Sequence, residues 1–186
     1  MKAATSTGDA EDVAPAASRP RVGAADLFRA HAGFVAGFLS KMGASAVDVD
    51  DLTQDVFLVA HRRGGYEHGS ARPTTWLAEI ALRVIATHRR GRRRKPSSTG
   101  IELDGMVGES APPDDVVDAR RALSRVARCL DGLDEQHRAV FVLFELEGEP
   151  CASIAAALDV PTGTVYSRLH HARRKFLETW EGDDGG

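Results

Sequence analysis

One stretch near the end of the chain constrains the fold most strongly, because it has the pattern of two short helices joined by a tight turn. Residues 151–176 read CASIAAALDVPTGTVYSRLHHARRKF. Ile154 and Leu158 are spaced for one face of a first helix, which Asp159-Val160-Pro161 interrupts. The apolar residues that recur at helical spacing after the turn are Val165, Leu169, Ala172 and Phe176.

The opposite face of the second helix is polar and basic. Its members are Gly163, Ser167, His170, His171 and Arg174, with Tyr166 on the flank. A second helix that buries one face and presents such side chains is typical of a helix-turn-helix that reads the DNA major groove. An ordinary helical hairpin with a solvated face has the same pattern, so this stretch alone leaves both interpretations open.

Composition favours an all-α fold in which positive charge is clustered. Aromatic residues make up 6% of the chain, and the periodic segments are filled with Ala, Leu, Val and Arg. The net charge is −3, yet residues 83–95, RVIATHRRGRRRK, hold seven Lys or Arg residues and no acidic residue. Such a cluster favours contact with phosphates or another polyanion.

Several classes of function are not expected from this sequence. Cys129 and Cys151 lack metal spacing, and no pair of the seven histidines has finger-like spacing, so we expect neither a metal nor a cofactor. The chain has no glycine-rich phosphate loop and no nucleophile motif, so we expect no enzyme activity. It has no apolar run of about 20 residues and no secretory signal, so we expect a cytoplasmic protein with no membrane partner.

Periodicity and composition divide the chain of 186 residues into two small helical domains. Residues 1–23, rich in Ala, Ser, Thr, Pro and Gly, are predicted to form a disordered tail. Residues 24–95 form the first domain, and 116–178 form the second. Residues 96–115 form a flexible linker that has no basic residue, and 179–186 form a short tail.

A helix predicted over 47–63 has an unusual outer face. Its members, named here the Leu58 face, are Asp51, Gln54, Asp55, Leu58 and Arg62. An exposed leucine inside a ring of acidic and amide side chains fits a docking surface for another protein. Isolated exposed leucines are also common on ordinary surfaces, so both interpretations stay open.

A longer helix, capped by Thr74 or Thr75, is predicted to end near Arg90. One stripe of it, named here the Trp76 stripe, contains Trp76, Arg83, Thr87 and Arg90. Next to the loop 64–73, which carries Tyr66 and His68, this stripe fits a surface on which unpaired bases stack. The alternative is that Trp76 is a core residue and that the arginines are solvated.

Taken in order, the motifs of residues 25–178 resemble the extracytoplasmic-function (ECF) sigma factors of bacterial RNA polymerase. The chain has Asp50-Asp51-Leu52-Thr53-Gln54-Asp55-Val56-Phe57, then Thr75-Trp76-Leu77 with Ile80-Ala81, then Leu133 and Arg138. Gly163-Thr164-Val165-Tyr166-Ser167-Arg168-Leu169 follows, with Ala172-Arg173 after it. One such motif alone would be weak support for membership of the family. Four motifs in the family's order and spacing are strong support.

The resemblance implies an alternative sigma factor that binds core polymerase, directs it to promoters and assists melting. The first domain would be sigma region 2 and the second sigma region 4. The implied partners are core RNA polymerase, through its β′ clamp helices and β flap, promoter DNA, and an anti-sigma factor. The rival interpretation, a stand-alone helix-turn-helix regulator, shares only the C-terminal hairpin.

The resemblance also assigns roles to residues. The Leu58 face would bind the β′ clamp helices. The −10 element would contact Tyr66, His68, Trp76, Arg83, Thr87 and Arg90, and phosphates would contact Arg89, Arg92, Arg93, Arg94 and Lys95. The −35 element would contact a set named here the reading face, which is Thr164, Tyr166, Ser167, Arg168, His170, His171, Arg173 and Arg174.

The chain departs from the family pattern at a few positions. Arg83 stands where members often have Asn, and Tyr166 stands where members often have a basic residue. Pro150 and Ser153 replace the usual Ser cap and the Glu before Ile-Ala. We therefore expect the helix that begins there to start less stably, by about 1 kcal/mol.

Overall fold

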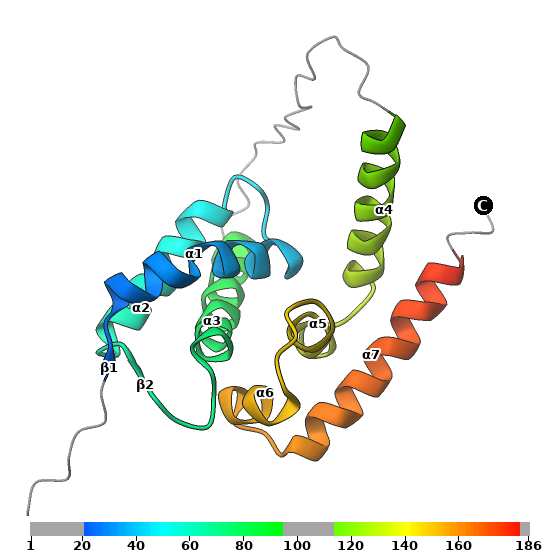
Figure 1. Ribbon diagram of the computed structural model, residues 1–186. Helices are drawn as coiled ribbons and strands as arrows, with labels where there is room; N and C mark the ends of the chain where they lie inside the picture. The colour runs from blue at the N-terminus through cyan, green and yellow to red at the C-terminus, as the bar shows by residue number, and fades with distance from the viewer. Residues whose placement is uncertain (1–20, 95–113, 183–186) are drawn as a thin grey trace, which may run out of the picture.

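Two helical units pack against each other in the computed structural model, which describes residues 21–94 and 114–182 (Figure 1). The first unit contains β1 (Arg21–Val22), α1 (Ala24–Lys41), α2 (Val49–Arg62), β2 (Tyr66–Glu67) and α3 (Pro73–Arg94). The second contains α4 (Asp114–Asp131), α5 (Glu135–Phe141), the π-helical turn η1 (Val142–Leu146), α6 (Cys151–Leu158) and α7 (Thr162–Gly182). Residues 1–20 of the predicted tail 1–23, residues 96–113 of the predicted linker 96–115, and residues 183–186 lie outside the described residues.

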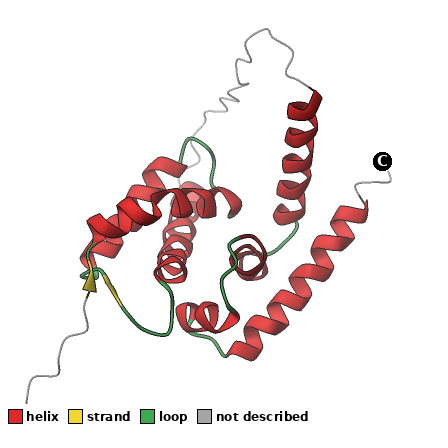
Figure 2. Ribbon diagram, in the orientation of Figure 1, coloured by secondary structure: helices red, strands yellow, loops and turns green. Residues whose placement is uncertain are grey.

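Helices dominate the described chain, as Figure 2 shows, and the predicted all-α fold is confirmed. In α2, Leu52, Val56 and Ala60 are buried at a spacing of four residues, while Asp50 and Asp51 occupy the first turn. Acidic residues there are stabilised by the positive end of the helix dipole. No helix in the described part of the chain is both long and apolar enough to cross a bilayer.

The first unit also holds a small sheet that the sequence analysis did not predict. Arg21–Val22 pairs antiparallel with Tyr66–Glu67, so residues 21–22 are ordered and do not belong to a disordered tail. Gly65, at φ +85°, makes the close approach of its backbone to Val22 possible, because a Cβ atom there would lie 2.3 Å from the Val22 carbonyl oxygen. Strands of two residues have no alternating pattern, so periodicity cannot reveal them.

The helix-turn-helix predicted in the second unit is present as α6 and α7. Before it, the Asp134 side chain caps α5 by accepting hydrogen bonds from the backbone N–H groups of Gln136 and His137, each at 3.1 Å. Asp159 ends α6 in the left-handed region at φ 52°, a conformation that Asp tolerates. Val165, Leu169 and Ala172 of α7 are buried, as their spacing predicts.

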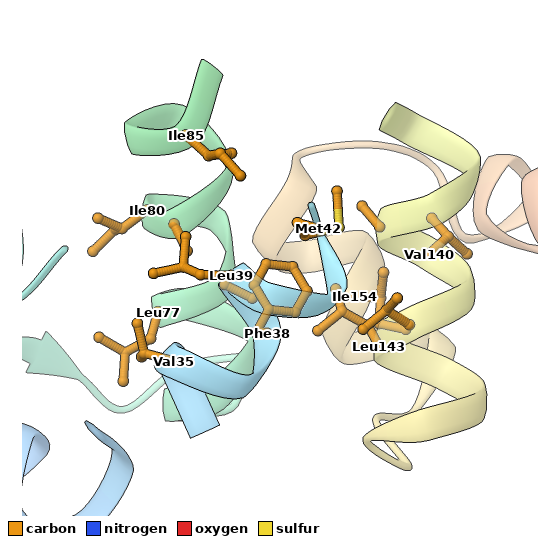
Figure 3. Close-up of a cluster of buried hydrophobic side chains, with 14 of the residues drawn as sticks. Val35, Phe38, Leu39, Met42, Leu77, Ile80, Ile85, Val140, Leu143 and Ile154 are labelled. Atoms are coloured by element: carbon orange, nitrogen blue, oxygen red, sulfur yellow. The ribbon is translucent and has the colours of Figure 1, made fainter. Parts of the chain in front are cut away.

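The hydrophobic core continues across the boundary between the units. Figure 3 shows Met42, at the end of α1, between Phe38 and the side chains of Val140, Leu143 and Ile154 from the second unit. All of these side chains are fully buried. The units therefore share apolar contacts, whereas the sequence alone predicted only a flexible connection between them.

We expect Phe38→Ala to lower the free energy of unfolding by about 3–5 kcal/mol, because it leaves a large cavity at a fully buried position of this core. Urea denaturation followed by circular dichroism measures the change. Leu123→Ala is the control: Leu123 is largely exposed, so its truncation should change stability by less than about 0.5 kcal/mol. Equal losses for the two variants would contradict the placement of Phe38.

Candidate functional site

The Leu58 face lies on the exposed side of α2, as predicted. All of its members are exposed, and the Leu58 side chain is 50% accessible although it is apolar. The opposite side of the helix buries Leu52 and Val56 against the core. The five side chains are therefore held on one surface by a helix whose other side is fixed by packing.

A groove of about 380 Å³ joins this face to the Trp76 stripe. Asp55, Leu58 and Arg62 line it from α2, and Arg83 and Thr87 line it from α3. Val59, Ile80 and Val84 add apolar side chains to the lining, and the other residues that line the groove are Arg63 and His88. Two surfaces that the sequence assigned to different partners are thus adjacent across one groove.

Glu79 organises the cations beside this groove and was not singled out from the sequence. Its carboxylate is buried and accepts a hydrogen bond from Arg63 Nη1 at 2.7 Å. Arg83, one turn along α3, forms an ion pair with the same carboxylate. The spacing of Glu79 and Arg83, four residues apart on a helix, was the available sequence signal.

Tyr66 has a structural role in the loop that was predicted to contact the −10 element. Its side chain is only 4% exposed, and its hydroxyl donates a hydrogen bond to the Ala71 carbonyl oxygen at 2.6 Å. Its ring centroid lies 5.7 Å from that of Trp76 and 5.2 Å from that of His68. Tyr66 therefore supports the loop, while His68 is exposed and Trp76 is partly exposed.

Two of the predicted phosphate-binding arginines already have partners within the protein. Arg89 donates a hydrogen bond to the Met42 carbonyl oxygen, and Arg92 pairs with Asp48 at 2.8 Å. A hydrogen bond from the Ser45 hydroxyl lowers the pKa of Asp48, and His88 and Arg92 lower it further. The side chains at positions 93–95 lie outside the described part of the chain.

Arg90, by contrast, is exposed, and its Nη2 donates a hydrogen bond to the Thr87 hydroxyl at 3.0 Å along α3. The pair keeps the far end of the Trp76 stripe facing solvent. Arg90 is therefore an exposed cation at this end of the stripe.

The reading face covers the solvent side of α7. Thr164 and Arg168 are half-buried, and the other members of the face are exposed, Tyr166 to 60%. Arg173 forms an ion pair with Glu145 of η1 at 2.5 Å. Arg174 lies 3.7 Å from Glu178 on the same helix, so polar and basic groups are presented together and two of the arginines have acidic neighbours.

Histidines continue this polar surface toward the start of α5. His137 Nδ1 lies 2.5 Å from Asp134 Oδ2, and the His137 ring centroid lies 5.9 Å from that of His171. Arg174 lies 3.5 Å from His171 Nδ1. The backbone N–H of His137, followed by its side chain, holds the pKa of Asp134 below its usual value.

Comparison with known proteins identifies the two units. Residues 27–95 match the family model of Sigma-70 region 2, and residues 123–176 match that of Sigma-70, region 4. The RNA polymerase sigma factor HrpL of Pseudomonas syringae pv. syringae is 36% identical over 145 residues, which cover 73% of this chain and 75% of HrpL. The chain belongs to the ECF subfamily of sigma factors.

Further relatives agree with this assignment. The ECF RNA polymerase sigma-E factor of Escherichia coli K12 is 31% identical over 147 residues, 75% of this chain and 76% of that protein. The structure of CnrH in complex with the cytosolic domain of CnrY superposes with a TM-score of 0.63 at 26% identity, over 86% of this chain and 88% of CnrH. RpoE of Bartonella quintana, solved with the anti-sigma factor NepR, shares the fold with a TM-score of 0.62 at 20% identity, over 83% and 94% of the two chains.

The protein is thus an alternative sigma factor that directs RNA polymerase in transcription initiation. The match to region 2 decides against the stand-alone regulator, which would account only for the C-terminal unit.

We expect Asp134→Ala to lower the free energy of unfolding at pH 7 by about 1 kcal/mol, because it removes the cap of α5. The folded-state pKa of Asp134 is lowered, so its stabilisation is present above the unfolded value of 3.8 and is lost as the pH falls through the folded value. Denaturation of both proteins at pH 7 and at successively lower pH tests this. A difference in stability that does not shrink with acidification would contradict it.

Proposed function

We propose that this sigma factor divides its work between three surfaces. The Leu58 face binds the clamp helices of the polymerase β′ subunit. The Trp76 stripe and the loop 64–73 bind the non-template strand of the −10 element, and the reading face binds the −35 element. The observation that carries the proposal is that each surface is exposed on a helix whose other side is buried in the core.

The chemistry of the Leu58 face suits a helical, basic partner. Leu58 supplies the apolar contact that excludes water, and Asp51, Asp55 and Gln54 surround it with acceptors. A polar rim around a small apolar centre is the usual anatomy of a reversible protein interface. Charges at such a rim mainly orient the partners and speed their association.

The Trp76 stripe suits unpaired bases. An indole that is partly exposed offers a stacking surface, and each stacked base contributes on the order of 1–3 kcal/mol. Arg83 and Arg90, both exposed and in line with Trp76, can neutralise the phosphates that follow. Stacking favours the separated strand over the duplex, so this surface would stabilise the melted promoter.

The reading face suits the major groove of a duplex. Ser167, Tyr166 and Arg168 lie in the first half of α7, where a recognition helix meets base edges. Arg173 and Arg174 lie further along the helix and fit phosphate contacts. Arg173 would exchange its ion pair with Glu145 for a DNA phosphate.

The packed arrangement of the two units does not allow the −10 and −35 elements to be bound at the same time. Arg90 of the Trp76 stripe and Arg168 of the reading face line one hollow of about 460 Å³. The −10 and −35 elements are roughly 25 base pairs apart, which is about 85 Å of B-DNA. We therefore propose that the units separate when the protein joins polymerase and promoter.

An anti-sigma factor is proposed as a further partner. CnrH and the Bartonella RpoE were solved bound to CnrY and to the anti-sigma factor NepR. The apolar lining of the α2–α3 groove, with Leu58 at its edge, offers such a protein an anchor next to the polymerase-binding face. A sigma factor acts where polymerase and chromosome meet, so we propose a cytoplasmic location.

We expect the protein to support promoter-specific transcription only together with core RNA polymerase. Run-off transcription on genomic promoter fragments measures this, with core enzyme alone as the control. Duplex DNA binding without any initiation by the combined proteins would rule out the proposed function.

We expect the double variant Asp55→Ala, Leu58→Ala to weaken binding to core polymerase at least about tenfold, since it removes the apolar centre of the Leu58 face and an acid beside it. Labelled core enzyme titrated with the variant measures the affinity, and circular dichroism checks the fold. The matched control, Val47→Ala with Asp50→Ala, changes an exposed aliphatic residue and an acid at the start of α2, outside this face. Unchanged core affinity of the first variant would refute the assignment of the face.

A further inference from the structure

A short acidic segment before the helix-turn-helix pairs with cations in both units. Its residues, ELEGE, are 145–149. Glu145 pairs with Arg173 of the reading face at 2.5 Å, and Glu147 pairs with Lys41 of α1 at 2.8 Å. Glu149 approaches Arg72, at the start of α3, with 3.8 Å between its Oε2 and Nη1 of the arginine. The last two pairs cross between region 4 and region 2.

Glu149 is unusual because its carboxylate is buried at the N-terminus of another helix. The residue is 5% exposed, and its Oε1 accepts a short hydrogen bond from the Thr74 hydroxyl in the first turn of α3. Among the described residues, Oε2 has no hydrogen-bond partner. A buried oxygen without a hydrogen-bond partner is costly, and a preference of the surrounding groups for negative charge would offset that cost.

The first turn of α3 supplies that preference. The leading N–H groups of a helix have no partner within the helix, and its dipole places partial positive charge there. Arg72 adds a guanidinium that is 60% exposed, and Thr74 adds a hydroxyl donor. A guanidinium, a hydroxyl and the start of a long helix are the groups that bind phosphate in many proteins.

This anion site adjoins the surface proposed for the −10 strand. Arg72 follows Ala71, whose carbonyl oxygen accepts a hydrogen bond from the Tyr66 hydroxyl. Trp76 lies one turn further along α3. Arg72 and Thr74 were not among the residues that the sequence assigned to the −10 element. A strand stacked on Trp76 would nevertheless carry its phosphates past them.

We propose that Arg72, Thr74 and the first turn of α3 bind a phosphate of the single-stranded −10 element, and that Glu149 occupies this site as an internal substitute for phosphate while the two units are packed. The inference rests on the function proposed above. It makes packing of the units and binding of the −10 strand mutually exclusive, because one anion site serves both. Region 4 thereby prevents region 2 from holding single-stranded DNA until the units separate.

The test measures binding of the full-length protein to a fluorescein-labelled, mixed-sequence single strand of about 12 nucleotides by anisotropy, over a range of salt concentrations. Glu149→Gln removes the charge of the substitute anion, and we expect it to tighten binding roughly tenfold, the effect of one hydrogen bond to a charged group. Adding Arg72→Ala to Glu149→Gln should reverse this gain and reduce the slope of log affinity against log salt by about 0.7.

Glu147→Gln is the matched control. It changes the net charge equally and also removes an ion pair between the units, but it lies away from the first turn of α3. Small-angle X-ray scattering reports whether each variant separates the units. When the two variants separate the units to a similar extent, Glu149→Gln should tighten binding of the single strand clearly more than Glu147→Gln does.

The outcomes distinguish a phosphate site that Glu149 occupies from an effect of unit separation alone. Equal tightening by both variants would overturn the proposal, since separation alone would then explain the effect. An unchanged salt slope on adding Arg72→Ala would overturn the phosphate site. If Glu149→Gln fails to fold, Glu149→Asp, which shortens the carboxylate arm, must tighten binding in the same direction. Promoter-specific transcription with core polymerase is measured separately. If the unmodified protein supports transcription but the variants show none of these affinity changes, only this inference is refuted. If the unmodified protein supports no transcription, the proposed function is refuted.

Discussion

The C-terminal end of α1 is the point on which the arrangement of the two units depends. Carbonyl groups at the end of a helix lack partners within it and carry partial negative charge. Arg138 of α5 donates from Nε to the Lys41 carbonyl oxygen at 2.6 Å, and Arg89 of α3 donates to the Met42 carbonyl oxygen. Arginines from both units thus satisfy the same helix end. Because Arg138 is buried, losing its partners would leave an unpaired charge in the interior, which is strongly destabilising.

Cations in this protein consequently have two alternative sets of partners. Arg89, Arg92 and Arg173 each lie beside a carbonyl or a carboxylate of the protein itself, although each was predicted to contact DNA. Two of these partners are carboxylates, Asp48 and Glu145, which neutralise the cations they contact while the two units are packed. In the proposed function, DNA binding would exchange these intramolecular contacts for phosphate contacts, so its affinity would reflect the difference between two sets of polar contacts rather than the sum of one.

Local patterns in the sequence were sufficient to predict the helices, but not the contacts between them. The spacing of Leu52 and Val56, or of Val165 and Leu169, identifies a buried helix face because it repeats every turn. The pair of Lys41 and Glu147 spans 106 positions, and no local pattern connects such distant residues. Tyr66 shows the same limit: an aromatic residue in a polar loop was predicted to contact DNA, yet its neighbours in space bury it. The position of Arg138 was recognised as a motif, but its role depends on a helix end nearly a hundred residues away.

Ser153 connects the departures of this chain from its family to the packing of the units. Pro150 provides no side-chain cap for α6, in agreement with the missing capping pair, and a small hydroxyl stands where Glu is usual. Ser153 is buried and accepts a hydrogen bond from the Arg72 backbone N–H at 2.8 Å, while its hydroxyl lies 2.7 Å from that of Thr75. A glutamate at this position would place a second carboxylate beside Glu149 and hold the two helix starts apart. The small Ser153 hydroxyl thus joins the start of α6 to the start of α3 through hydrogen bonds to the Arg72 backbone and the Thr75 side chain.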